Sequence, residues 1–417
     1  MGHTKRANGR SLATRLRAPV PAVVAGLAAS VAVYLGVRAL IHPSMVDLVV
    51  YRAEGAAVAA GVDLYGPLAA PHDLRATYPP FAAMLFTALI VPPYEVLRDV
   101  AIAANIALLF VAALLSCRLV GVDGRRRTTV AVAVTALGIW AEPVFTTFRY
   151  GQINMLLLVL ILADFTRPPT ARTRGLALGI AVGIKVTPGI FVLYLLLTRR
   201  FREAAVAVAA FLATVGVGFA ALPDASRRFW TDLVMDPTRV GRLENAANQT
   251  VRGMAVRITH TRDTGTVWFV LIAVVAVAGM ACAVFAYRRL GDRWGLPVCA
   301  VTGLLVAPIA WTHHWVWCIP IAVLLWVDAR PALSAVAVFW TFAVWYVPHV
   351  PFVELHFAPW QTALSGWYVL FGLGFLVFAA RQAWHAAPPE SRLGPRPRRE
   401  PMAAAGSGPT VGGASAG

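Results

Sequence analysis

Asp47 is the first residue along the chain whose type and setting could serve acid or base chemistry. It follows a long apolar segment, residues 20–41, and its neighbours Val46, Leu48 and Val49 are hydrophobic. Burial raises the pKa of a carboxyl group and makes the carboxylate a better base, so Asp47 is a candidate general base. The alternative is that Asp47 caps a helix at this point. Three further carboxylates precede residue 78 and are expected to be solvated loop charges: Glu54, Asp63 and Asp73.

A lysine and two adjacent histidines are candidates for binding an anion. Lys185 lies inside the apolar stretch 174–198, where a charged side chain costs about 2.5–3.5 kcal/mol on insertion scales and is by default a functional candidate. His313 and His314 point in different directions if they lie on a helix, and no HxxxH or HExxH spacing is present, so a shared metal is not expected. A histidine that binds phosphate as a cation or hydrogen-bond donor fits better. The flanking Trp315 and Trp317 are expected to belong to an aromatic belt.

Amide and aromatic side chains outside the apolar runs are candidates for binding a hydroxyl-rich ligand. Asn248 and Gln249 stand together in the polar segment 223–265, and each amide offers both donors and an acceptor. A polar surface loop explains them equally well. The residues Asn248, Gln249 and Thr250 also match a glycosylation sequon, a pattern that occurs often by chance.

Several common sites are missing from the sequence. There is no Gly-rich phosphate loop, GxSxG elbow or zinc motif, and no inverted repeat of the kind that marks many transporters. The four cysteines have no CxxC or metal-ligand spacing and are expected to be small core residues: Cys117, Cys282, Cys299 and Cys318. Long polar loops together with a lysine in an apolar segment favour an enzyme over a carrier.

The composition places these residues in a membrane protein. Of 417 residues, 59% are hydrophobic and 14% are charged, whereas soluble domains have about a quarter charged residues. Apolar segments of the length that crosses a bilayer recur from Val20 almost to Ala380, which excludes a single-anchor enzyme. The net charge of +17 comes from basic residues clustered between the apolar runs. These clusters indicate topology in a lipid bilayer, not a nucleic-acid surface.

The pattern predicts an all-α polytopic fold with about ten to twelve transmembrane or re-entrant helices. After residues 20–41, the apolar candidates are 79–93, 96–120, 128–148, 152–165, 174–198, 203–222, 266–288, 296–311, 315–328, 331–348 and 361–380. The positive-inside rule places the arginines at 199–202, 288–293 and 330 inside, and it places 223–265, His313, His314 and 349–360 outside. We expect a basic cytoplasmic N-terminus at 1–19, a transmembrane catalytic domain at 20–385 and a disordered cytoplasmic tail at 386–417.

The middle of the chain needs two interruptions to satisfy the same rule. Residues 79–120 must contribute one net crossing, interrupted at Pro92 and Pro93, and 174–198 must be a broken pair hinged near Lys185 to Pro188. The basic cluster at 125–127 then lies inside. Under this topology both the segment 150–154, which contains Gln152, and Lys185 approach the outer face.

The ordered set of these motifs resembles a known family. The set consists of Asp47 with Tyr51, Tyr78 to Phe81, Gly151 with Gln152 and Asn154, Lys185 with Pro188, Asn248 to Thr250, and Ala307 to His314. It resembles glycosyltransferase family 87, the actinobacterial polyprenol-phosphate-mannose-dependent alpha-1,2-mannosyltransferases of the membrane glycosyltransferase C (GT-C) fold. The similarity spans residues 46–380. Thr250 and Ala307 stand where the family pattern has Ser.

The resemblance implies an inverting sugar transfer at the outer face of the plasma membrane. The donor would be polyprenyl-phosphate-mannose and the acceptor a phosphatidylinositol mannoside or lipomannan-type glycan, joined through an alpha-1,2 linkage. Asp47 would be the general base, and Lys185, His313 and His314 would bind the donor phosphate. No cofactor is expected, and fixed cations would stabilise the phosphate without a metal ion. Sugar or acceptor contacts are expected from Tyr78, Gln152, Asn248, Gln249 and Trp311.

Other functions remain open from the sequence. The same fold and base would suit a decaprenyl-phosphate-arabinose donor, because no residue decides the sugar. A polytopic lipid or polysaccharide transporter with a relay between Asp47 and Lys185 is a third possibility, although it leaves the long outer loops unexplained. A scaffold without catalytic activity is a fourth.

Overall fold

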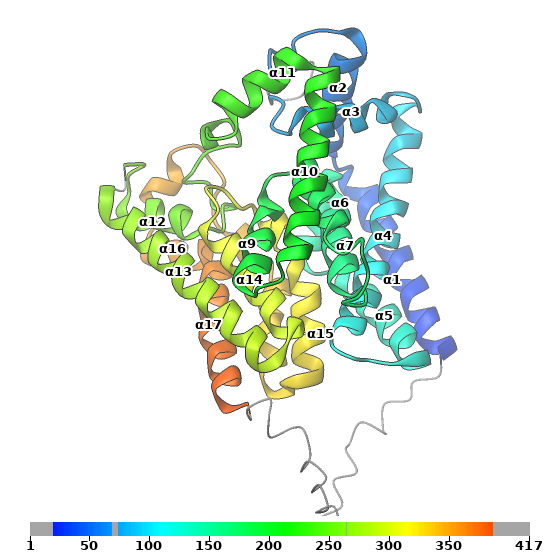
Figure 1. Cartoon of the computed structure of the whole chain (residues 1–417), viewed down its shortest axis with the longest axis vertical. Helices are drawn as coiled ribbons and strands as arrows, with labels where there is room; N and C mark the ends of the chain where they lie inside the picture. Colours follow the sequence, from blue (N-terminus) through cyan, green and yellow to red (C-terminus); the bar gives the residue numbers. More distant parts are fainter. Residues whose placement is uncertain (1–19, 69–73, 264, 387–417) are drawn as a thin grey trace, which may run out of the picture.

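The computed structural model describes residues 20–68, 74–263 and 265–386, and this part of the chain is built almost entirely from helices (Figure 1). The expected N-terminal segment 1–19 and the expected tail 386–417, apart from Ala386, lie outside the described residues. The first half contains α1 Val20–Ile41, α2 Val46–Ala60, α3 Pro80–Phe86, α4 Tyr94–Leu119, α5 Gly124–Gly138, α6 Glu142–Tyr150, α7 Asn154–Phe165, α8 Leu176–Ile184, α9 Ile190–Leu197 and α10 Phe201–Ala221. The second half contains α11 Pro223–Arg228, α12 Val251–Thr259, α13 Gly265–Leu290, α14 Asp292–Val306, α15 Cys318–Asp328, α16 Pro359–Ser365 and α17 Trp367–His385.

Short tight turns of helix connect several of these elements. The 3-10 segments are Thr87–Ile90, Thr187–Gly189, Pro237–Arg239, Thr312–Trp317, Arg330–Trp340, Ala343–Tyr346 and Val353–His356, and Phe229–Leu233 is π-helical. The apolar stretch 331–348 is therefore not the α-helical span that its composition predicts. Its two 3-10 segments are separated near Phe342, which has a left-handed backbone with φ of 54°.

Among the residues that the structure describes, five helices are long and apolar enough to cross a membrane, namely α1, α4, α10, α13 and α17. The predicted span 128–148 is instead the pair α5 and α6, bent by 72°. Pro143, in the first turn of α6, has no N–H to donate to the carbonyl of residue 139, so one straight helix cannot continue through this point. With this bent pair the structure offers up to six such crossings. The chain is thus an all-α polytopic membrane protein.

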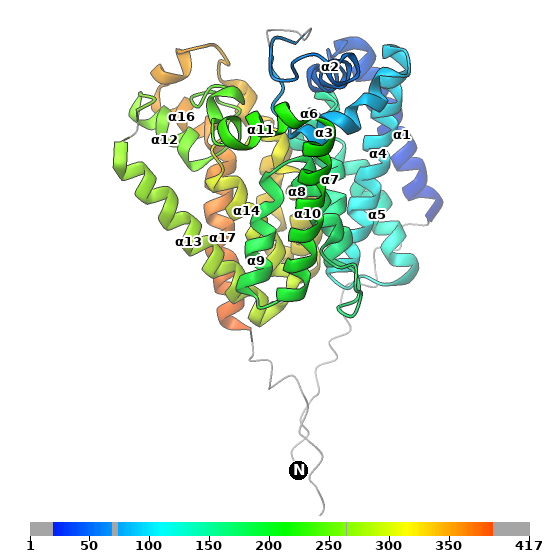
Figure 2. The same ribbon diagram turned by 45° about the horizontal axis from the view of Figure 1, so that its top comes forward.

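The segments expected on one side of the membrane lie at one end of the helical bundle. Figure 2 shows α2, α3, α11, α12 and α16 toward the upper end, whereas the first residue of α1 and the last of α17 lie toward the lower end. The arginine-bearing starts of α5 and α10 also lie toward the lower end (Figure 2). The basic clusters are therefore separated along the bundle from the loops that carry the candidate site.

Glycines allow α8 to pack closely on α10. Cβ atoms added to Gly175, Gly179 and Gly183 would lie 2.3 Å from the Glu203 carbonyl oxygen, 2.3 Å from the Ala207 carbonyl oxygen and 2.1 Å from the Thr214 hydroxyl oxygen. Small residues spaced four apart permit such close approach in membrane bundles. This packing fixes α8, the helix that ends just before Lys185.

A large apolar core fills the bundle between the helices. It includes three of the four cysteines as buried residues, Cys117, Cys299 and Cys318, and Cys282 packs against it. All four are free thiols, as the sequence predicts.

Candidate functional site

Asp47 lies in the first turn of α2, a helix that immediately follows α1. From the sequence, Asp47 could cap a helix, and a helix does begin here. The residue at its N-cap position is Met45, however, and no side chain caps the helix. Asp47, Tyr51 and Glu54 are spaced i, i+4 and i+7, so they share one face of α2. Glu54 is fully buried rather than solvated, which corrects the prediction made from its position in a polar segment. Asp63 is an exposed loop charge paired with Arg228, as expected, and Asp73 lies outside the described residues.

The environment of Asp47 favours its neutral form. Its side chain is half-buried and closely surrounded by protein, and this loss of water raises its pKa to about 6. A hydrogen bond from Gln152 and the positive charge of Lys185 act in the opposite direction. A carboxylate whose pKa is near 6 is basic enough to accept a proton and is still largely ionised at neutral pH.

Two tyrosines and a glutamine hold one wall beside Asp47. The Tyr51 hydroxyl donates to Gln152 Oε1 at 2.8 Å, and the Tyr51 and Tyr78 hydroxyl oxygens are 2.8 Å apart. Their rings meet edge to face, with centroids 5.1 Å apart. With its oxygen accepting from Tyr51, the Gln152 amide is oriented with its NH2 group available to Asp47.

Gly151 brings Gln152 against α2. Its φ is 70° at the end of α6, and a Cβ there would lie 2.7 Å from Leu48 Cβ. Both the left-handed conformation and the close approach therefore require glycine. The predicted sites at Asp47, Tyr78 and Gln152 thus meet in space. The part that Tyr51 plays in this wall was not predicted, although its spacing from Asp47 gives the signal once a helix is assumed.

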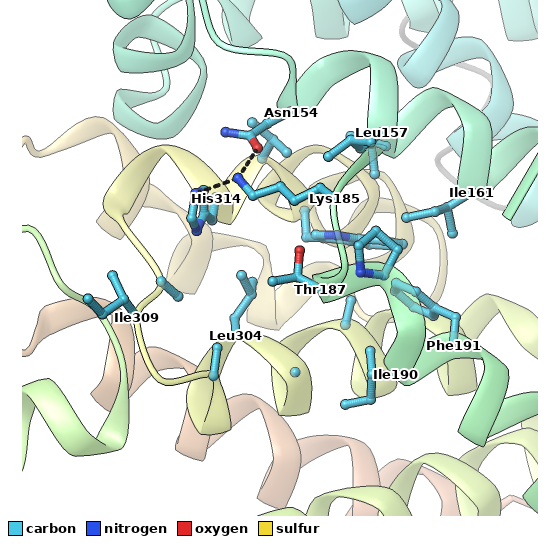
Figure 3. Close-up of a pocket in the computed structure, with 18 residues that line it drawn as sticks. Asn154, Leu157, Ile161, Lys185, Thr187, Ile190, Phe191, Leu304, Ile309 and His314 are labelled. Carbon is cyan, nitrogen blue, oxygen red and sulfur yellow. Dashed lines mark hydrogen bonds between the residues drawn. The ribbon is translucent and has the colours of Figure 1, made fainter. Parts of the chain in front are cut away.

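Lys185 sits at a break in the apolar segment 174–198. The helix α8 ends at Ile184, Lys185 has an extended backbone, and Thr187–Gly189 forms a 3-10 turn before α9 begins. The predicted hinge at Lys185 to Pro188 is therefore confirmed. The break turns the lysine toward His314 Nε2, 3.1 Å from Lys185 Nζ, and toward Asn154 Oδ1 at 3.4 Å (Figure 3).

The two histidines occupy different environments in the segment 312–317. His314 Nδ1 accepts a hydrogen bond from the Trp311 backbone N–H at 3.2 Å. Burial and the nearby Lys185 charge lower the pKa of His314 far below its usual value, so the ring is neutral and its hydrogen lies on Nε2. The His313 ring packs edge-on against Tyr150, and its buried Nε2 has no partner among the described residues.

A cavity of about 80 Å³ adjoins Lys185 and His314. Figure 3 shows Lys185 pointing toward Asn154 and His314 at one side, with Thr187 and otherwise mainly apolar side chains on the remaining walls. Those walls include Leu157, Ile161, Ile190, Phe191, Leu304 and Trp317. The cavity thus combines a polar, cationic corner with an apolar lining.

Asn248 and Gln249 are fully buried, and their amides are used inside the protein. Asn248 Nδ2 donates to the Leu243 carbonyl at 3.0 Å, and its Oδ1 accepts from the Ala310 N–H at 3.3 Å. Gln249 Nε2 donates to the carbonyls of Ala246 and Ser365, and its Oε1 accepts from the Tyr368 N–H. An isolated β-bridge joins Asn248 to Trp311. The pair therefore anchors the segment that leads to His314.

The tryptophans of this segment differ from expectation. Trp315 and Trp317 are buried at 0% and 6% exposure, so they do not form an aromatic belt. Trp317 packs against Phe191 beside the cavity. Trp311 is half-buried, and Gly241 lies against its ring, where a Cβ would come within 2.6 Å of Trp311 Cζ2.

The polar groups of the site are amide, amine and imidazole groups placed around one carboxylate, Asp47. Within the described ranges, no group of three or more His, Cys, Asp or Glu residues could hold a metal ion.

Comparison with known proteins identifies relatives over most of the chain. The model of glycosyltransferase family 87 matches residues 76–308. A Mycobacterium tuberculosis (strain CDC 1551 / Oshkosh) protein named polyprenol-phosphate-mannose-dependent alpha-(1-2)-phosphatidylinositol pentamannoside mannosyltransferase is 38% identical, over 85% of this chain and 84% of the relative. A Mycolicibacterium smegmatis protein of the same name is also 38% identical, over 70% and 71% of the two chains.

A further relative from Mycobacterium tuberculosis (strain H37Rv) is named for phosphatidylinositol mannoside as acceptor and is 30% identical over 81% of this chain and 84% of its own length. No solved structure matches the chain significantly. The family match includes Tyr78, Gln152 and Lys185, and the longer alignments extend the similarity over most of the remaining chain. The chain belongs to glycosyltransferase family 87.

Proposed function

We propose that this enzyme transfers mannose from polyprenyl-phosphate-mannose to a phosphatidylinositol mannoside or lipomannan-type acceptor, forming an alpha-1,2 linkage with inversion. Support for the donor and acceptor comes from relatives named for this donor, with pentamannoside or mannoside acceptors, that share 30–38% of their residues with the chain. The observation that carries the proposal is the pairing of Lys185 and His314 beside an apolar cavity, with Asp47 nearby.

The Lys185 and His314 pair suits a phosphate because both facing groups are donors. His314 Nδ1 accepts from Trp311, so its Nε2 carries a hydrogen and faces the ammonium of Lys185 at 3.1 Å. Two donors this close cannot satisfy one another. A phosphate oxygen would accept from both and would receive a charge-assisted hydrogen bond from the lysine. His313, with an unpartnered Nε2, is assigned to the same anion as a weaker contact.

The apolar walls of the cavity suit the hydrocarbon that a polyprenyl phosphate carries. Leu157, Ile161, Phe191 and Leu304 line the space adjoining the cationic corner. Burying apolar chain against such walls is favourable at about 25 cal/mol per Å². A phosphate attached to an isoprenoid therefore fits this site better than a free sugar phosphate.

In the reaction, Asp47 removes the proton from an acceptor hydroxyl as its oxygen attacks the anomeric carbon of the donor. A new carbon–oxygen bond forms while the bond to the phosphate oxygen breaks, and the electron pair leaves with polyprenyl phosphate. Lys185 and His314 stabilise the charge that develops on that phosphate. Trp311 offers an aromatic face for a sugar, and Gln152 orients Asp47 and contacts hydroxyls. Tyr78 is buried, with Lys185 Nζ 5.5 Å from the centroid of its ring, so a sugar contact from Tyr78 would require the lysine to move.

Asn248 and Gln249 support the site in this account by fixing the segment 311–314. Their amide groups already bond protein atoms, so a direct contact with sugar hydroxyls would require those bonds to exchange. The extracytoplasmic placement of the site is supported by the separation of α2 from the basic starts of α5 and α10 along the bundle (Figure 2).

The donor sugar is tested by incubating the purified full chain in nanodiscs with a phosphatidylinositol mannoside and either polyprenyl-phosphate-mannose or decaprenyl-phosphate-arabinose. We expect mannose transfer, with an alpha-1,2 linkage established by linkage analysis of the product. Arabinose transfer in place of mannose would keep the mechanism and overturn the donor. No transfer from either donor would overturn the proposed function.

A further inference from the structure

The helix that carries Asp47 separates two sites. Asp47, Tyr51 and Glu54 lie on the face of α2 toward Gln152 and Lys185. The opposite face of the helix lines a second cavity, of about 740 Å³, which we call the α2 groove. Its lining residues on α2 are spaced as one helical face, and other walls come from the following loop and the start of α4. The full lining is Val49, Arg52, Ala53, Ala56, Ala57, Val62, Pro67, Leu68, Ile90 and Tyr94.

The α2 groove is apolar except at one place. Only Arg52 and Tyr94 among its lining residues carry polar side-chain atoms. Val62 in the lining and Val91 beside Ile90 are 60% and 81% exposed, so apolar surface continues outward from the groove. Because α4 is one of the long apolar helices and begins at Tyr94, the groove opens where the chain meets the bilayer surface. An occupant with a hydrocarbon chain suits such a surface.

Arg52 gives the polar part of the groove a positive charge, and Arg38, which is not among the lining residues and donates from Nη2 to Met45 Sδ at 3.1 Å, adds a second charge near Tyr94. The Arg52 guanidinium donates to the carbonyls of Leu89, Ile90 and Pro92 at 3.3–3.4 Å, and no carboxylate in the described ranges pairs with it. Arg38, whose charge together with that of Arg52 acts on the Tyr94 hydroxyl, is nine-tenths buried. Its Nη1 has no partner in the part of the chain that the structure describes.

The third nearby arginine is already neutralised. Arg98 pairs with Glu95 at 2.8 Å and lies 3.7 Å from Asp99. Arg38 and Arg52 therefore leave an excess of positive charge beside an apolar groove. An anionic headgroup joined to a hydrocarbon chain complements both features, and a phosphodiester accepts bidentate hydrogen bonds from a guanidinium.

We propose that the α2 groove binds the phosphatidyl anchor of the acceptor glycolipid, with an acyl chain against the alanines of α2 and the phosphate at Arg52. This inference rests on the proposed function and assigns its lipid acceptor a site on the far side of α2 from the donor phosphate. The glycan of a phosphatidylinositol mannoside then reaches around the N-terminal end of the helix to Asp47. The lipid anchor thereby adds affinity without occupying the donor cavity.

The test compares acceptors with and without the anchor. The acceptors are a phosphatidylinositol mannoside and a water-soluble oligomannoside, and the enzyme variants are Ala56→Phe and Arg52→Gln. Each variant should raise the KM of the lipid acceptor by about tenfold. Arg52→Gln removes a charge-assisted contact with the phosphate, and Ala56→Phe blocks the groove. The KM values of the soluble acceptor and of the donor should not change. The matched control for Ala56→Phe is Ala59→Phe, which changes an exposed alanine on α2 outside the groove and should keep the wild-type KM. The matched control for Arg52→Gln is Arg52→Lys, which keeps the charge and should give an intermediate KM for the lipid acceptor.

Unchanged KM for the lipid acceptor in both variants, or equal changes for both acceptors, would overturn the proposal. A measurement without turnover separates it from the proposed function: full-length protein in nanodiscs is cross-linked to diazirine-bearing phosphatidylinositol and the labelled peptides are mapped. We expect labelling of α2 that Ala56→Phe lowers and Ala59→Phe does not. Labelling in a protein that transfers no mannose would refute only the proposed function, whereas no labelling of α2 would refute the groove.

Discussion

At the scale of single residues, the protonation of Asp47 should control the rate. Its pKa is raised to about 6 by burial, so the basic form is lost as the pH falls through that value. We expect kcat/KM to be highest between about pH 7 and pH 8 and to fall by about tenfold per unit well below pH 6. It should also fall above about pH 8, because burial lowers the pKa of Lys185 to about 8 and the neutral amine binds the donor phosphate less well. Initial rates across this range give the profile. Asp63→Asn, which removes an exposed carboxylate paired with Arg228, should leave the profile unchanged.

A flat profile between about pH 7 and pH 5 would contradict the role of Asp47 as base. Glu54 adds a second titrating group to the same helix face, because burial raises its pKa to about 8. Its Oε1 accepts from the Thr77 N–H at 3.4 Å, and its Oε2 has no partner among the described residues. This group is neutral across the acid range, so it does not obscure the fall in rate due to Asp47.

Residue type and local spacing predicted the central groups of the site but not the environments of several others. Asp47, Tyr78, Gln152, Lys185 and His314 come together as expected. The errors concern Glu54, Trp315 and Trp317, all of which are buried by parts of the chain outside their own helical segments. Trp315, for example, packs against Phe339 and Tyr368. A single sequence does not indicate which apolar surface will cover a polar or aromatic side chain.

At the scale of elements, the contact between α8 and α10 should be sensitive to one methyl group. Gly179→Ala places a Cβ 2.3 Å from the Ala207 carbonyl oxygen, so α8 must move from α10 and carry Lys185 with it. We expect a loss of stability of about 1–3 kcal/mol, as in other overpacked cores, together with a raised KM for the donor. Thermal unfolding in detergent and donor kinetics measure the two effects.

The control for this contact is Gly36→Ala in α1, where an added Cβ meets nothing within 4 Å. That change should be neutral or stabilising, because alanine is favoured over glycine in a helix by about 1 kcal/mol. Equal behaviour of the Gly179 and Gly36 variants would show that close approach of α8 and α10 is not needed.

The elements themselves were largely predictable where proline or charge interrupts an apolar run. The breaks at Pro92 and Pro93 and at Lys185 to Pro188 are where the sequence places them. The bend between α5 and α6 was missed although Pro143 marks it, because hydropathy alone joins the two helices. The 3-10 structure at 330–340 has no comparable signal. Short helices such as α2 are stabilised mainly by tertiary contacts, which a single sequence does not reveal. The segment after α1 was therefore expected to be a loop.

At the scale of the whole molecule, the fold brings two lipid-facing features to the two sides of one short helix. The cationic corner and apolar cavity lie between α7, the break at 185–188, α9, α14 and the segment 307–317. The α2 groove is lined by the face of α2 that carries Arg52 and Ala56. The expected outer segments collect at the same end of the bundle (Figure 2). In the proposed mechanism, this arrangement would give a lipid-linked donor and a lipid-linked acceptor separate approaches to Asp47.

The central claim is that Asp47 is the base of an inverting transfer whose leaving group is bound by Lys185 and His314. The most direct measurement is the release of polyprenyl phosphate from polyprenyl-phosphate-mannose, with a mannoside lipid as acceptor, by wild-type protein and by Asp47→Asn. The substitution keeps the size of the side chain and removes the base. We predict a loss of turnover of at least about a hundredfold with donor binding unchanged. Turnover within about threefold of wild type would contradict the account, because general-base catalysis contributes about a hundredfold or more.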